Sequence, residues 1–175
     1  EALGGKAALG EKLDALFGES SEVYGPSFLH DVSGLIGQYA HGNEPSHHIA
    51  YFYRFSDRPE RTEQIVRKIC TGLYNDTPDG DCGNDDAGAM ASWYVFSAMG
   101  FYPFDPCGGE YIVGAPQVCG ATLNLPNGNV FRISTSGFAG DGRPVRRVTL
   151  NGRELSDWKF SHAELTAGGE LKFEF

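Results

Sequence analysis

The hydrophobic pattern of the chain changes its period near residue 105, and this change limits the folds that the chain can adopt. Before Pro103, apolar residues recur three or four positions apart, as on one face of an α-helix. After Pro106, apolar and polar residues alternate and β-branched residues are frequent, as in half-buried strands. Because the two periods suit different elements, we predict an α+β fold with helices in residues 1–105 and a β-rich domain in residues 106–175.

Successive short helices are predicted in the first part of the chain. They cover residues 6–17, 31–39, a segment that begins at Pro45, 62–74 and 86–98. The helix over 62–74 has the clearest apolar face, whereas glycines weaken the helix that begins at Asp31, so packing must support it. In the helix from Pro45, the expected buried side chains are Ile49, Phe52 and Tyr53. Short connections between such helices predict an antiparallel array.

A small antiparallel sheet or sandwich is predicted in the second part. Its strands cover residues 111–113, 122–125, 130–134, 145–150 and 171–175. Asn127-Gly128 and Asn151-Gly152 predict tight hairpin turns, since Asn and Gly tolerate the positive φ that these turns require.

The bulk composition excludes some classes of partner. The chain has 175 residues and a formal charge of −9, which argues against nucleic acid and anionic membranes as partners. No run of 18 apolar residues is present, so no membrane-spanning helix is expected. The first residues lack the basic and apolar regions of a signal peptide, which says nothing about secretion if the chain is an excised segment.

The cysteines do not form a zinc pattern, because none belongs to a Cys-x-x-Cys pair. Cys70 and Cys82 bracket a loop, and Cys107 and Cys119 flank a predicted strand, so either local pair could form a disulfide bond. Buried free thiols are the simpler expectation.

Two polar segments that each lead into an apolar helix indicate a site. The first covers residues 41–52 and contains His41-Gly42-Asn43-Glu44, and the second covers residues 83–103 and begins with Gly83-Asn84-Asp85-Asp86. Alternate helices of an antiparallel array begin on the same side. We therefore expect the two polar segments to lie close together.

The first segment offers two kinds of metal ligand. Asn43 and Glu44 supply oxygen atoms, which suit a hard cation such as calcium, whereas His47 and His48 supply nitrogen atoms, which suit zinc better. One carboxylate is a weak calcium site, so water or substrate hydroxyl groups would have to complete it. The alternative is structural: Glu44 or Ser46 caps the following helix.

The second segment places two adjacent acids, Asp85 and Asp86, at a predicted helix N-terminus. The helix dipole there is expected to lower a carboxyl pKa, which suits a base that activates water. The structural alternative is again capping, and one of the two acids is expected to act as a cap.

The two segments, their order and spacing, and the β-rich tail resemble the C-terminal portion of glycoside hydrolase family 92, the calcium-dependent exo-acting α-mannosidases. The resemblance runs from about Tyr24 to the C-terminus and implies a segment of a much longer secreted or periplasmic protein. It places residues 1–105 in an (α/α)6-type catalytic domain. The implied substrate is a glycan that contains α-1,2-linked mannose. The other implied partner is the remainder of the polypeptide, with upstream helices and an N-terminal β-sandwich.

The same resemblance assigns roles to individual residues. It implies that Asn43 and Glu44 bind calcium that also holds O2 and O3 of mannose. Asp86 would be the general base of an inverting hydrolysis, supported by Asp85, while His47 and Asn84 would contact the substrate. Family members often carry an acid where Asn84 stands here, and Gln where this chain has Ala89.

The general acid is expected outside this chain. In the family it lies well upstream of the calcium-binding Asn-Glu pair, and no residue before Asn43 stands in a matching context. The isolated chain is therefore expected to be inactive. Two alternatives stay open, a non-catalytic carbohydrate-binding module, which would contact sugar through residues 108–175, and a structural module, which would bind no metal.

Overall fold

The computed structural model describes residues 3–25 and 32–175 and packs as two compact units, residues 1–94 and 95–175. The division falls inside one helix, and the assignment of residues 1–105 and 106–175 to separate domains of a longer protein stays a prediction. Helices and sheets are both present, which confirms the α+β fold class. Within the described residues, no helix is long and apolar enough to cross a membrane.

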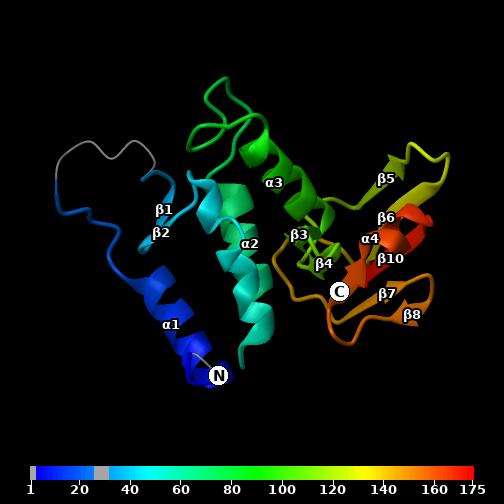
Figure 1. Ribbon diagram of the computed structural model, residues 1–175, viewed down its shortest axis with the longest axis horizontal. Helices are drawn as coiled ribbons and strands as arrows, with labels where there is room; N and C mark the ends of the chain where they lie inside the picture. The colour runs from blue at the N-terminus through cyan, green and yellow to red at the C-terminus, as the bar shows by residue number, and fades with distance from the viewer. Residues whose placement is uncertain (1–2, 26–31) are drawn as a thin grey trace. The chain divides into compact units, whose positions relative to one another are not determined.

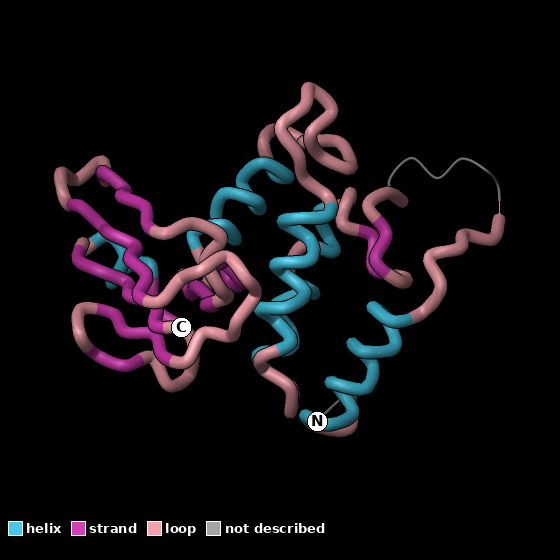
Figure 2. Tube along the Cα trace, turned by 180° about the vertical axis from the view of Figure 1, so that it is seen from behind, coloured by secondary structure: helices cyan, strands magenta, loops and turns pink. Residues whose placement is uncertain are grey.

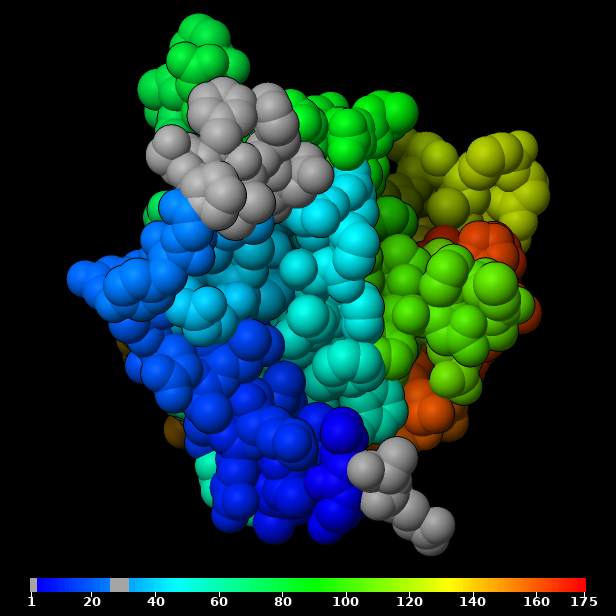
Figure 3. All heavy atoms as spheres, turned by 60° about the vertical axis from the view of Figure 1, so that its left-hand side comes forward, coloured from blue at the N-terminus to red at the C-terminus, as the bar shows by residue number. Residues whose placement is uncertain are grey.

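The first unit is mainly helical (Figure 1). Its elements are α1 (Lys6–Gly18), a two-stranded hairpin of β1 (Leu35–Ile36) and β2 (Tyr39–Ala40), the 3-10 helices η1 (Glu44–Ser46) and η2 (Ile49–Phe55), α2 (Arg61–Gly72), and the beginning of α3 (Ala89–Met99). In α2, Ile65, Val66 and Ile69 are buried, as the sequence pattern predicts. In the space-filling view, the blue atoms of the N-terminal residues lie directly against the cyan and teal atoms of residues further along the first unit (Figure 3).

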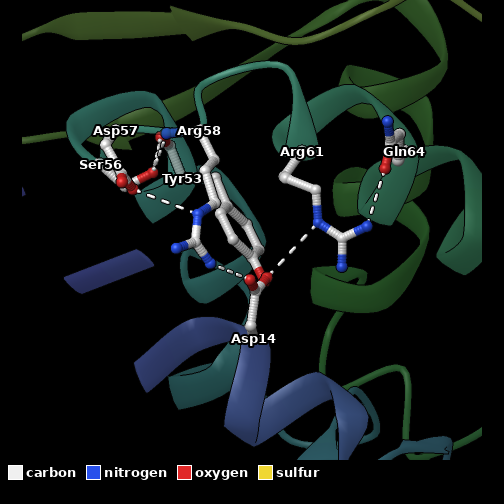
Figure 4. A network of polar contacts seen from close by, with 7 residues as sticks. All are labelled: Asp14, Tyr53, Ser56, Asp57, Arg58, Arg61 and Gln64. Atoms are coloured by element: carbon white, nitrogen blue, oxygen red, sulfur yellow. Dashed lines mark hydrogen bonds and ion pairs between the residues drawn. The ribbon is translucent and has the colours of Figure 1, made fainter. Parts of the chain in front are cut away.

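Polar contacts tie α1 to η2 and the start of α2. Figure 4 shows Asp14 of α1 pointing toward Tyr53, Arg58 and Arg61. The Tyr53 hydroxyl donates to Asp14 over 2.7 Å, Arg58 forms an ion pair with the same carboxylate, and Arg61 lies 3.5 Å from it. The Tyr53 ring is fully buried. One carboxylate of α1 therefore contacts η2, the start of α2 and the loop between them.

The helix predicted over residues 31–39 is wrong, because these residues include the β1–β2 hairpin. Gly37 has a φ of 61°, and a Cβ there would lie 2.4 Å from the carbonyl oxygen of Leu16. The Gln38 amide donates to that carbonyl over 2.8 Å. Contact with the end of α1 thus requires glycine in a turn, which overrides the weak helical pattern. Asp31 lies outside the described residues.

The helix predicted from Pro45 is two 3-10 helices, and its buried side chains differ from the prediction. Ala50, Tyr51 and Tyr53 are buried, while Phe52 and Ile49 are only partly covered. A 3-10 helix has three residues per turn, so the face expected for an α-helix does not form.

The helix predicted over residues 86–98 begins later, at Ala89. Asp86, Ala87 and Gly88 have φ values of 42°, 58° and 93°, which no right-handed helix accommodates. The C-terminal end of the prediction is correct to within one residue.

The second unit contains most of the strands, drawn in magenta in Figure 2. They form two sheets that share one apolar core. One sheet has the order β5 (Gly120–Asn124), β6 (Val130–Ser136), β10 (Gly169–Glu174), β7 (Arg147–Leu150) and β8 (Arg153–Glu154). The other has the order β3 (Phe101–Asp105), β4 (Glu110–Val113) and β9 (Lys159–Ser161). The helix α4 (His162–Thr166) follows β9 and begins with a capping box formed by Ser161 and Glu164.

The turn predictions for this unit are confirmed. Asn127-Gly128 lies in the turn between β5 and β6, and Asn151 and Gly152 have φ values of 50° and 81° in the turn between β7 and β8. The sheet is mixed, since β10 pairs with β6 in parallel. The strand β3 is absent from the predicted strands. It lies at the edge of the other sheet, which is where Pro103, with no amide hydrogen to donate, is tolerated.

All four cysteines lie in the described residues and are free thiols. Cys70 is buried, Cys82 is half-buried, and Cys107 and Cys119 are exposed. The expectation of buried thiols is therefore correct only for Cys70.

Candidate active site

Two glycines bring the two polar segments together in the first unit. A Cβ added to Gly83 would lie 2.6 Å from the carbonyl oxygen and 2.7 Å from the Cα of Gly42. A Cβ added to Gly42 would in turn meet the Ser33 hydroxyl and lie 3.2 Å from the Cys82 carbonyl oxygen. Only glycine fits such a backbone contact. The sequence shows a glycine in each segment, but nothing in the spacing indicates that they touch.

The structure brings the carboxyl groups of Glu44 and Asp86 into a hydrogen bond, which places these two predicted site residues side by side. This bond and the charge of Glu44 raise the pKa of Asp86 above its ordinary value, with smaller contributions from burial and from Asp85. The expectation that the helix dipole would lower the pKa is therefore wrong for Asp86. Its carboxyl lies outside α3 and faces another acid, whose effect is larger than that of a dipole.

Asp85 and Asp86 differ in what they contact. The Asp85 carboxylate accepts a hydrogen bond of 2.9 Å from the Ala91 amide, so Asp85 caps α3, as expected for one of the two acids. Asp86 is exposed and has the left-handed φ of 42°, which is uncommon for a residue other than glycine. The cap holds the turn, and the turn directs Asp86 toward Glu44.

The N-cap residues of the two 3-10 helices, Asn43 and His48, make no side-chain capping hydrogen bond. Pro45 stands in the first turn of η1. Capping by Glu44 or Ser46 stays a prediction. Asn43 and Glu44 are partly exposed, which leaves their oxygen atoms near the surface. Within residues 3–25 and 32–175, no group of three or more His, Cys, Asp or Glu side chains is placed to hold a metal ion. A cation here would need water or substrate as additional ligands.

The other two predicted substrate contacts lie in different surroundings. Asn84 is exposed. His47 is buried, its Nε2 lies 3.1 Å from the His41 carbonyl oxygen, and its own carbonyl accepts a hydrogen bond of 2.9 Å from the Trp93 indole. Burial lowers the pKa of His47. His47 therefore holds the loop together, and substrate contact by His47 or Asn84 stays a prediction.

A separate pocket of about 330 Å³ lies in the second unit. Tyr111 and His162 line it, and the Tyr111 hydroxyl lies 2.9 Å from Nδ1 of His162. Asp105, Cys107 and Glu110 also line this pocket. The carbohydrate-binding alternative would place the sugar here, because the pocket lies within the β-rich part of the chain.

The model of the glycosyl hydrolase family 92 catalytic domain matches residues 1–175. The chain therefore belongs to glycosyl hydrolase family 92.

Solved structures of two family relatives from Bacteroides thetaiotaomicron are similar to this chain. One is a family GH92 α-mannosidase in complex with mannoimidazole, 32% identical with a TM-score of 0.86, covering 95% of this chain and 22% of that chain. The other is a family GH92 inverting mannosidase, 38% identical with a TM-score of 0.79, covering 98% of this chain and 24% of that chain.

A fungal protein is also similar in sequence. It is described as an uncharacterized secreted glycosidase from Arthroderma benhamiae and is 30% identical over 163 residues, covering 91% of this chain and 20% of the relative. The chain thus spans about a fifth of the length of the curated relative that it matches.

Proposed function

We propose that this chain is the C-terminal segment of an exo-acting α-mannosidase. The whole enzyme hydrolyses the α-1,2 bond of a terminal mannose with inversion. The observation that carries the proposal is the hydrogen-bonded pair of Glu44 and Asp86, formed by the two polar segments. Family membership supports it, as do the solved relatives, one of which is described as an inverting mannosidase. The name of the fungal relative supports secretion of the whole protein.

In this proposal Asp86 is the general base. Its carboxyl is exposed, so water can reach it and give up a proton to it. Asp85 keeps the turn in place through its bond to the Ala91 amide, and Asn84 orients water or a sugar hydroxyl. The general acid comes from the part of the protein outside this chain, because inversion requires two carboxyl groups on opposite faces of the sugar.

Asn43 and Glu44 would hold calcium, the cation that suits their oxygen atoms. The carboxyl pair supports this assignment, since two facing carboxylates repel each other and a cation between them relieves that repulsion. When bound, calcium would supply positive charge that orients the hydroxyl groups of mannose. His47 anchors this loop, since its carbonyl accepts the hydrogen bond of Trp93 in α3, and contact of His47 with the sugar belongs to the same proposal.

The test is the Asp86→Asn variant of the full-length protein. Asp79→Asn, which makes the same change at another exposed acid, is the control. We expect kcat on α-1,2-mannobiose to fall by about 10²–10⁴-fold in Asp86→Asn and to stay unchanged in the control. Glu44→Gln should abolish calcium binding measured by calorimetry. Wild-type kcat in Asp86→Asn would contradict the proposal.

The isolated 175-residue chain should show no turnover of mannobiose or aryl mannosides, with or without calcium. The chain supplies the base, but the general acid that protonates the leaving oxygen is expected in the rest of the protein. Turnover of mannobiose by the chain alone would place a general acid within it.

The pocket in the second unit favours one alternative, a carbohydrate-binding module without catalysis. Titration of the chain with mannose, followed by NMR, distinguishes the two. Shifts confined to Tyr111 and His162 would favour the module, and shifts at Asn43 and Asp86 would favour the enzyme.

A further inference from the structure

A buried chain of three hydrogen bonds lies behind the carboxyl pair. The Tyr39 hydroxyl is 2.7 Å from Nδ1 of His41, Nε2 of His41 is 2.6 Å from the Tyr74 hydroxyl, and that hydroxyl donates to the Met90 carbonyl over 3.2 Å. Because Tyr74 donates to Met90, it must accept from His41, and His41 must then accept from Tyr39. In these three bonds, Tyr39, His41 and Tyr74 each donate one hydrogen, so the bonds run in a single direction from Tyr39 to Met90.

These bonds join the two segments that carry the acids. His41 stands two residues before Asn43 in the first segment. Met90 lies in the first turn of α3, and its amide approaches the Asp85 carbonyl oxygen at 3.3 Å. Tyr74, which follows α2, connects the two. A movement of either segment would therefore break a bond to Tyr74.

The ring of Tyr74 has a second role that can be separated from its hydroxyl. It stacks on Trp93, with ring centroids 6.1 Å apart and an interplanar angle of 6°. Trp93 also packs edge-on against His41, with centroids 4.4 Å apart. Phenylalanine at position 74 would keep this packing and remove only the hydroxyl. The directional bonds, rather than the apolar contacts, then decide the position of the segment that contains Glu44.

We propose that Tyr74, acting through His41, is a positioning residue that holds the segment of Glu44 at the distance from α3 at which Glu44 and Asp86 meet. The inference rests on the proposed function, since it assigns Tyr74 an effect on the same carboxyl pair. Neither Tyr74 nor His41 has to touch the substrate. Their effect on turnover passes through the placement of Glu44 relative to Asp86.

The experiment compares Tyr74→Phe with Tyr53→Phe in the full-length protein. Tyr53 is the matched control because its hydroxyl also makes a hydrogen bond of 2.7 Å in the first unit, but to Asp14 on α1. We expect kcat to fall about 10- to 100-fold in Tyr74→Phe, because misplaced catalytic groups cost rate, with KM changed less than kcat. Tyr53→Phe should keep kcat within about twofold, since its hydroxyl does not connect the two segments.

Three outcomes would overturn the inference. They are wild-type kcat in Tyr74→Phe, equal kcat losses in both variants, and a loss that appears only in KM. If Tyr74→Phe does not fold, Tyr39→Phe, which removes the first donor of the chain of bonds, should give a smaller loss of kcat in the same sense, and wild-type kcat there would also refute the inference.

The proposed function is tested separately in the same series. Asp86→Asn with wild-type kcat would refute both proposals. If Asp86→Asn loses activity and Tyr74→Phe does not, only the positioning inference fails. In the double variant Asp86→Asn with Tyr74→Phe, we expect a loss smaller than the product of the two single losses, because part of the effect of Tyr74 passes through the placement of Glu44 relative to Asp86. Independent, multiplicative losses would overturn the inference.

Discussion

The two units of the chain use different interactions inside. Among the described residues, the polar side chains buried in the first unit include the ionisable His41, His47 and Glu63, whereas those in the second unit are the hydroxyl residues Ser97 and Thr149. The core of the second unit is apolar and spans both sheets. Apolar packing supplies stability without direction, while buried polar groups demand specific partners. The unit with the acids therefore combines apolar packing with directional bonds, whereas the β-rich unit depends mainly on packing.

The largest expected effect on stability tests whether the second unit depends on apolar packing. Phe173 is fully buried in the central strand β10, so Phe173→Ala should lower the free energy of unfolding by about 3–5 kcal/mol. Urea unfolding of the chain, followed by circular dichroism, measures this loss. Leu3, which is 51% exposed, provides the control as Leu3→Ala and should change stability by less than about 0.5 kcal/mol. A loss below about 1 kcal/mol in Phe173→Ala would contradict the dependence on packing.

A smaller loss of stability, with a larger effect on the site, is expected in the first unit. In Gly83→Ala the new methyl group meets backbone atoms of Gly42, which cannot rotate away, and overpacking of this kind costs about 1–3 kcal/mol. The two polar segments should separate, so the full-length protein should lose activity even below its unfolding temperature.

The matched control is Gly72→Ala at the end of α2, where a Cβ meets nothing within 4 Å. This change should be neutral or slightly stabilising, since alanine restricts the unfolded chain. Thermal unfolding and kcat are measured on both variants. Equal activity of the two variants would show that the contact between Gly42 and Gly83 does not set the site.

The same difference explains how much of the molecule the sequence predicts. Helix α2 and the turns at Asn127 and Asn151 depend on local period and local φ preferences, which the residues themselves display. The capping box of Ser161 and Glu164 is also a local signal, but the prediction overlooked it, together with the short strands beside it.

The candidate site is predictable only in part. The acids stand out as residue types at the start of apolar segments, and the structure places Glu44 beside Asp86. The late start of α3, the hairpin at Gly37 and the raised pKa of Asp86 all arise from contacts between residues distant in sequence. No local period contains that information, because tertiary contacts override weak helix propensity.

The smallest expected effect concerns pH and the polar contacts around Asp14. Burial alone would raise the pKa of Asp14, but hydrogen bonds from Tyr53 and Arg58 and the charge of Arg61 outweigh it, so the pKa lies below its ordinary value of 3.8. A carboxyl whose pKa is lowered by folding stabilises the folded state above its unfolded pKa and loses this contribution as pH falls through the folded pKa. About a third of the Asp14 side chain is exposed, at 35%, so water screens the interaction and the contribution should stay below about 1 kcal/mol.

Asp14→Asn should therefore destabilise the chain slightly at pH 7, and the difference from the wild type should shrink below about pH 4. Urea unfolding at pH 7, 5 and 3 measures it, with Asp79→Asn as a control for an exposed acid. Asn can still accept a bond from Tyr53, so the change isolates the charge that faces Arg58 and Arg61. A difference that is the same at all three pH values would show that the charge of Asp14 contributes nothing. Asp14 would then stabilise the first unit through the geometry of its hydrogen bonds and not through its charge, which sharpens the contrast with the apolar core of the second unit.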